Sequence, residues 1–95
     1  MAISTVNSPA VDRLNRAALS ISNNIAEGNG RLTKPDRRHF FGISRGSVHE
    51  CVTMLELARR RRLLTTEAHA SLKDNLEEIA RMLSGLINGL DKRDG

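Results

Sequence analysis

Arginine is the residue type through which this chain could do chemistry, and the sequence gathers it into two groups. One group joins two residues near the N-terminus to a run of four, and the other lies between residues 31 and 38. A guanidinium presents a planar fork of donors that matches phosphate oxygens, so both groups are candidate nucleic-acid contacts. The candidates are Arg13, Arg16, Arg59, Arg60, Arg61, Arg62, Arg31, Lys34, Arg37 and Arg38.

The composition limits which features of a nucleic acid the arginines and their neighbours could recognise. Phe40 and Phe41 are the only aromatic residues, so stacking on bases is not expected and contacts should go to the backbone. The run 59–62 turns by about 100° per residue on a helix, so its members cannot share one face. A solvated basic helix end explains part of the run equally well, because cations are favourable at a helix C-terminus. Both interpretations stay open.

Catalytic and metal-binding patterns are weak. The histidines His39, His49 and His69 do not have the spacing of a metal site, and no glycine-rich phosphate loop follows a strand. The single cysteine, Cys51, lies on an apolar stripe, which favours a core residue over a nucleophile. We therefore expect a protein that is not an enzyme and uses no cofactor.

Three helices account for the hydrophobic pattern, and no strand alternation is present. We expect helices from Pro9 to about Gly28, from about Lys34 to Arg62, and from a cap at Thr65 to about residue 90. Ser8, Thr33 and Thr65 are the expected caps. Short loops make neighbouring helices antiparallel, so the predicted fold is an all-α up-down bundle. Residues 1–8 are then a flexible arm, 9–90 one domain, and 91–95 a flexible tail.

Each helix carries apolar residues at steps of three and four, which predicts the buried faces. Gly28 is expected to end the first helix in a left-handed conformation. Gly46, in the middle of the second helix, is expected to admit the backbone of a neighbour. The stripes are Val11, Leu14, Ala18, Ile21 and Ile25; Phe41, Ser44, Val48, Cys51, Leu55 and Ala58; and Leu72, Leu76, Ile79, Leu83, Leu86 and Leu90.

Charge and hydropathy indicate which partners the protein could have and where in the cell it could lie. Residues 1–62 hold 11 Lys/Arg against 5 Asp/Glu, whereas residues 63–95 hold 4 against 6. This basic balance favours anionic partners without requiring them. No apolar run is long enough to span a membrane and no secretion signal is evident, so we expect a cytoplasmic protein.

Two blocks of the sequence resemble a known family. Arg16-Ala17-Ala18, Ser20-Ile21 and the segment Asn24 to Gly28, followed by Phe41, Ile43, Gly46-Ser47 and Glu50, are similar to the signature of the four helix bundle proteins. These are also called 23S rRNA intervening-sequence proteins and include accessory proteins of diversity-generating retroelements. The resemblance marks Asn24, Glu27, Gly28, Gly46, Ser47 and Glu50 as motif residues. We expect a structural network in which Glu27 or Glu50 accepts from Arg16, Arg45 or the loop backbone, with contact to a ligand as the alternative.

The resemblance also implies assembly and function. Family members usually begin with a further amphipathic helix, in place of which this sequence has about ten residues. A bundle without that helix exposes an apolar face, so we expect a homo-oligomer, which the family resemblance suggests is a pentamer. The implied function is that of a non-enzymatic, nucleic-acid-associated accessory factor of a mobile element, binding RNA or DNA. The alternative is a protein-interaction module or inhibitor that docks its apolar face on a partner protein.

Overall fold

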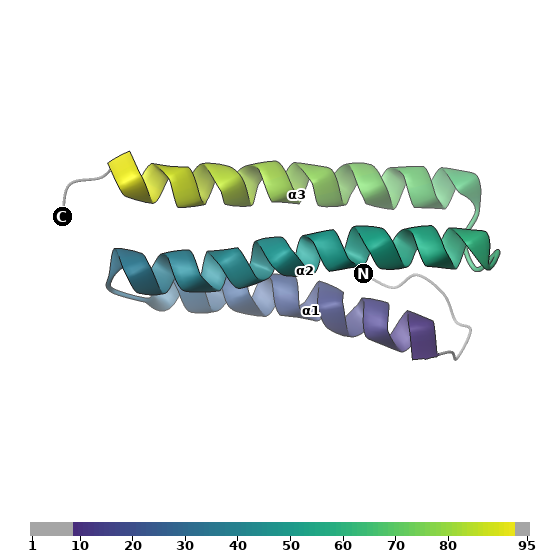
Figure 1. The fold of residues 1–95 in the computed structure, drawn as a ribbon, viewed down its shortest axis with the longest axis horizontal. Coiled ribbons are helices and arrows are strands. Elements are labelled where there is room, and N and C mark those ends of the chain that lie inside the picture. The colour runs from purple at the N-terminus through teal and green to yellow at the C-terminus, as the bar shows by residue number, and fades with distance from the viewer. Residues whose placement is uncertain (1–8, 93–95) are drawn as a thin grey trace.

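The computed structural model describes residues 9–92, which form three long helices and contain no strand. They are α1 (Pro9–Gly30), α2 (Lys34–Arg60) and α3 (Thr66–Lys92). Successive helices run in opposite directions, and α2 lies between its two neighbours in sequence (Figure 1). The all-α up-down arrangement predicted from the sequence is confirmed. Ser8 and the two flexible segments expected at the termini lie outside the described residues, apart from positions 91 and 92.

The end of α1 differs from the prediction. The helix continues through Gly28 to Gly30, and Gly28 does not adopt a left-handed conformation. The last turn is held instead by the backbone N–H of Arg31, which donates to the carbonyl of Gly28 over 3.2 Å. The start agrees with expectation, because Pro9 is the first helical residue, where its missing N–H costs no helical hydrogen bond.

Threonine caps begin the other two helices, as predicted. The Oγ1 of Thr33 accepts from the backbone N–H of Asp36 over 3.3 Å. The Oγ1 of Thr65 accepts from the backbone N–H of Ala68 over 3.0 Å. Each bond satisfies a donor that the first helical turn leaves without a partner, which fixes where the helix starts.

The end of α2 is closed by a left-handed residue that is not glycine. Arg62 has φ of 59°, and its N–H donates to the carbonyl of Arg59. The next N–H, of Leu63, donates over 2.9 Å to the carbonyl of Ala58. This pair of bonds is the Schellman arrangement, in which the left-handed position is usually glycine. The helix therefore ends at Arg60, two residues earlier than predicted.

Arg62→Gly is expected to stabilise the protein by up to about 1 kcal/mol, because glycine adopts this conformation without the steric cost that a Cβ brings. The gain should appear as a higher melting temperature in circular dichroism. Arg61→Gly is the control, since Arg61 has φ of −85° and gains nothing from the substitution. A loss of stability in Arg62→Gly would contradict this account of the turn.

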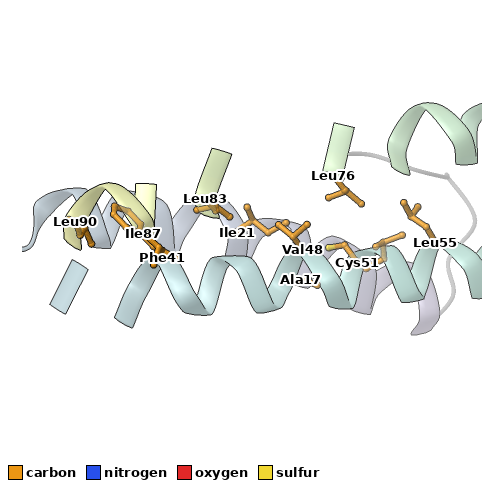
Figure 2. Packing of buried hydrophobic residues seen from close by; sticks show 11 residues of the cluster. Ala17, Ile21, Phe41, Val48, Cys51, Leu55, Leu76, Leu83, Ile87 and Leu90 are labelled. Carbon is orange, nitrogen blue, oxygen red and sulfur yellow. The ribbon is translucent and has the colours of Figure 1, made fainter. Parts of the chain in front are cut away.

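The core is one row of side chains between the helices (Figure 2). The predicted stripe of α2 is confirmed in full, since all six of its residues are buried. On α1 the buried residues are Leu14, Ala17 and Ile21, while Ala18 and Ile25 are only partly buried. The side chain of Val11 lies outside what the structure describes. The core consists of Leu14, Ala17, Ile21, Phe41, Val48, Cys51, Leu55, Leu76, Leu83, Ile87 and Leu90.

The α3 stripe agrees with the prediction except near its end, since Leu76, Leu83 and Leu90 are buried and Leu72 and Ile79 pack against the core. Leu86 is 40% exposed, whereas Ile87, which the sequence did not mark, is buried. The reason is that α3 packs on α2 alone, since no Cα of α1 and α3 within the described residues approaches within 8 Å. A helix with one neighbouring helix buries a narrower face than a helix seated between two.

Small residues bring α1 and α2 together, but at Gly28 and not at Gly46. A Cβ placed on Gly28 would lie 2.6 Å from Cε1 of Phe41, so the ring occupies the space that a side chain would need. A Cβ on Gly46 would meet nothing within 4 Å, and the residue is exposed. The expectation that a neighbouring backbone passes Gly46 is therefore wrong, because this glycine points away from both α1 and α3.

Candidate nucleic-acid interface

The start of α1 and the end of α2 lie at the same end of the molecule, which brings the first arginine group together (Figure 1). Arg13 of α1 and Arg61, just after α2, line one surface pocket of about 280 Å³. Its other walls are apolar or polar side chains of the two helices, namely Ala10, Glu50, Thr53, Met54 and Leu57. The antiparallel pairing of the helices is what makes residues 48 positions apart neighbours.

Two arginines of the run 59–62 are engaged inside the protein. The carboxylate of Glu56 accepts from Nε and Nη2 of Arg59 and from Nε of Arg60, the last over 3.3 Å. Its Oε2 also lies 3.2 Å from Nε2 of His69, at the start of α3. The hydrogen bonds from Arg59, then that from Arg60, lower the pKa of Glu56 to about 2, and the same contact raises the pKa of Arg59. Glu56 thus stays ionised and offsets part of the positive charge.

The remaining arginines of this end are exposed and unpaired within residues 9–92. No carboxylate oxygen of that part of the chain lies within 4 Å of the guanidinium nitrogens of Arg13, Arg16, Arg61 or Arg62. Arg16 lines a second hollow, which shares Arg13 and Glu50 with the first. We name Arg13, Arg16, Arg61 and Arg62 the arginine end. Its guanidinium groups are available to an external anion.

The second basic group, at the opposite end, is tied to the loop between α1 and α2. Arg31 pairs with Glu27 over 3.0 Å, and its guanidinium lies 4.6 Å from the centroid of the Phe40 ring. Nε of Arg37 donates to the carbonyl of Arg31 over 2.7 Å. Lys34 and Arg38 also have interaction partners. The contacts of Arg31 and Arg37 join the loop to the helices on either side of it, so these two arginines have a structural role.

The motif residues divide into two kinds. Nδ2 of Asn24 donates to the carbonyl and to Oγ of Ser20, whose Oγ lies 3.0 Å from Oγ of Ser47. Together with Ser44, whose Oγ donates to the carbonyl of Ile21 over 2.8 Å, these residues join α1 to α2. Asn24 and Ser47 thus belong to a structural network, together with Ser20 from the family signature and Ser44 from the predicted stripe of α2.

The two motif carboxylates do not make the contacts that we expected. Glu27 accepts from Arg31, and not from Arg16 or Arg45. Arg45 instead reaches Ser84 of α3, at 3.5 Å. Glu50 is exposed, lies between the two hollows of the arginine end, and forms no ion pair within residues 9–92. Glu50 therefore belongs to the candidate interface and not to the internal network.

An apolar groove of about 410 Å³ lies between α1 and α3. Met82 is 64% exposed and Leu19, on the adjacent surface of α1, is 59% exposed. The groove contains no charged residue, and its lining comprises Ala18, Ile21, Ser22, Ile25, Leu76, Ile79, Met82, Leu83 and Leu86. This is the apolar face that the sequence predicted for a bundle with three helices.

Other candidate chemistry finds little support in the described part of the chain. Residues 9–92 contain no cluster of three or more His, Cys, Asp or Glu side chains that could hold a metal ion. Cys51 is fully buried, and burial raises the pKa of its thiol, which disfavours the reactive thiolate. None of the helices in this range has an apolar stretch long enough to cross a membrane.

Comparisons with known proteins agree with the two sequence blocks and with the fold. A search of curated proteins finds no match. A comparison with protein families matches residues 7–85 to the 23S rRNA-intervening sequence protein family, which is most of the chain and includes every motif residue and the whole arginine end. The chain belongs to the 23S rRNA-intervening sequence protein family.

Proposed function

We propose that this protein is a non-enzymatic nucleic-acid-binding protein, acting as an accessory factor of a mobile element, and that the arginine end contacts the phosphate backbone. The observation that carries the proposal is that four exposed guanidinium groups meet at one end of the bundle without a carboxylate partner within residues 9–92. Leaving four cations unpaired at one place is unfavourable unless solvent or an anion compensates them. The name of the family, which refers to ribosomal RNA, is compatible with an RNA ligand.

Some of the arginines pair with a carboxylate inside the protein and others do not, and this difference can be tested. Arg59 and Arg60 already share the carboxylate of Glu56, so their removal should affect binding less than removal of the unpaired residues. Arg16→Gln/Arg62→Gln is expected to weaken binding to RNA and DNA alike. It should lower the slope of log affinity against log salt by about 2, roughly one for each lost phosphate contact.

The measurement is fluorescence anisotropy with mixed-sequence duplex and single-stranded oligonucleotides carrying 5′-hydroxyl ends, at several salt concentrations. Lys73→Gln/Arg81→Gln is the matched control, because it removes the same charge from α3, a helix that contributes no residue to the arginine end. Its slope should stay within about 0.5 of the wild-type value. Absence of wild-type binding at low salt, or equal losses in both variants, would contradict the proposal.

A second function is favoured by the apolar groove. We propose that the protein self-associates and that a second copy covers the groove between α1 and α3. A groove without charge, flanked by the exposed side chains of Leu19, Met82 and Leu86, is unfavourable in water and typical of protein contact surfaces. A three-helix chain of this size also has a small core of its own. Docking on a different protein is the competing outcome, and the mass of the wild type and of Met82→Asp in light scattering separates the two.

A further inference from the structure

We propose that the pocket between Arg13 and Arg61 binds the terminal nucleotide of a nucleic-acid strand through its terminal phosphate. This inference rests on the proposed function and adds a ligand group to it: a phosphate monoester at a strand end, in preference to the diester groups along the backbone.

The positions of the two arginines are the first argument. Arg13 comes from the second turn of α1, and Arg61 is the residue that caps α2, so two separate elements supply the two sides of one pocket. Two guanidinium forks can share up to three terminal oxygens of a phosphate monoester, whereas a diester offers only two. The monoester also carries more negative charge, close to two units at neutral pH.

The other walls of the pocket suit the rest of a nucleotide. Met54 and Leu57 provide apolar surface, and Leu57 remains 46% exposed in this structure. Glu50 and Thr53 add polar groups at the rim, and the carboxylate of Glu50 can accept from a sugar hydroxyl or a base amino group. A volume of about 280 Å³ is just below the range typical of small-molecule sites, so the pocket has room for a group of about one nucleotide at most and not for a duplex.

The neighbouring hollow offers a place for the next phosphate along the strand. It shares Arg13 and Glu50 with the pocket and adds Arg16 and Ser47, so a further guanidinium lies beside that of Arg13. The next phosphate of a strand that starts in the pocket would meet Arg16 there. By contrast, the hollow toward α3, which shares Thr53 and Leu57 with the pocket, contains Arg60 and Lys73 together with Glu56, whose carboxylate already engages Arg60. Arg13 and Arg61 pair with no carboxylate of residues 9–92, so their donors, unlike those of Arg60, are open to an anion.

The test compares one single-stranded RNA sequence in three forms, with a 5′-phosphate, a 3′-phosphate, or hydroxyl groups at both ends. We expect one phosphorylated form to bind about tenfold more tightly than the hydroxyl form, the effect of one added charge-assisted hydrogen bond. The form that gains identifies which strand end enters the pocket. Arg13→Gln and Arg61→Gln should each abolish the gain while the hydroxyl form still binds.

Arg62→Gln is the matched control, because Arg62 follows Arg61 directly but does not line the pocket. It should lower the affinity for all three RNAs by the same factor and keep the preference for the phosphorylated form.

Equal affinity for the three RNAs, with salt-dependent binding intact, would overturn this inference and leave the proposed function standing. Absence of binding to any RNA would overturn both. If Arg13→Gln changed the mass of the assembly in light scattering without changing the preference, the pocket would be a contact between copies, and the inference would fall.

Discussion

Gly28→Leu is expected to destabilise the protein by about 3 kcal/mol, in the upper range for inserting a side chain into a packed interior. The Cβ of any residue at this position would lie 2.6 Å from Cε1 and 2.8 Å from Cδ1 of Phe41. Phe41 is only 3% exposed, so its ring cannot move aside without opening the core. The two helices must separate locally, and the loss exceeds the roughly 1 kcal/mol that replacing a helical glycine returns.

Gly46→Leu is the matched control, since it makes the same substitution in the other helix of the pair. The Cβ at Gly46 meets nothing within 4 Å, so this variant should gain up to about 1 kcal/mol from helix propensity. Thermal and urea unfolding would measure both variants at the same protein concentration. The Gly28→Leu/Phe41→Leu double variant should recover part of the lost stability, because leucine at position 41 leaves free some of the space that the phenylalanine ring occupies beside position 28. A Gly28→Leu variant as stable as the wild type would show that the helices do not approach as described.

The two glycines show where sequence reasoning reaches its limit. Gly28 follows the last periodic residue of the first helix, which suggested a left-handed end, and Gly46 lies in the middle of the second, which suggested a close approach. Which of them faces a neighbour depends on the rotation of each helix about its axis, and this rotation is set by contacts far apart in sequence. The stripe of α2 was predictable because α2 is covered on two sides, which leaves one solution for its orientation. The stripe of α3 was misplaced by one position at Ile87, because a helix packed on one side has more freedom.

The arginine run was predictable in position but not in function. Antiparallel helices of similar length place the start of α1 near the end of α2, and the structure brings Arg13 and Arg61 to one pocket. Engagement of Arg59 and Arg60 by Glu56 follows from spacings of three and four on a helix, so the sequence contained this signal. The third partner of Glu56, His69, could not be found in this way, since the contact joins two helices. The pocket beside Glu50 likewise requires the packed pair α1 and α2.

Ile25→Asp is also expected to have a large effect and to lower the free energy of unfolding by about 3 kcal/mol. Ile25 is partly buried, packs against the core and lines the groove between α1 and α3. No cation lines this groove, so a carboxylate placed there has no partner to offset its desolvation. The loss should be seen as a lower melting temperature and a lower urea midpoint. An unchanged melting temperature would mean that α1 does not turn this face toward α3.

Met82→Asp separates the stability of one chain from its assembly. Met82 lines the same groove but is 64% exposed, so the same charge should change the free energy of unfolding of an isolated chain by no more than about 0.5 kcal/mol. If a second copy covers the groove, Met82→Asp lowers the mass measured by light scattering at micromolar concentration while the helices stay folded. If the wild type is a monomer by the same measurement, self-association fails. A partner of a different sequence then becomes the occupant to look for, since the groove still presents the apolar surface of α1 and α3.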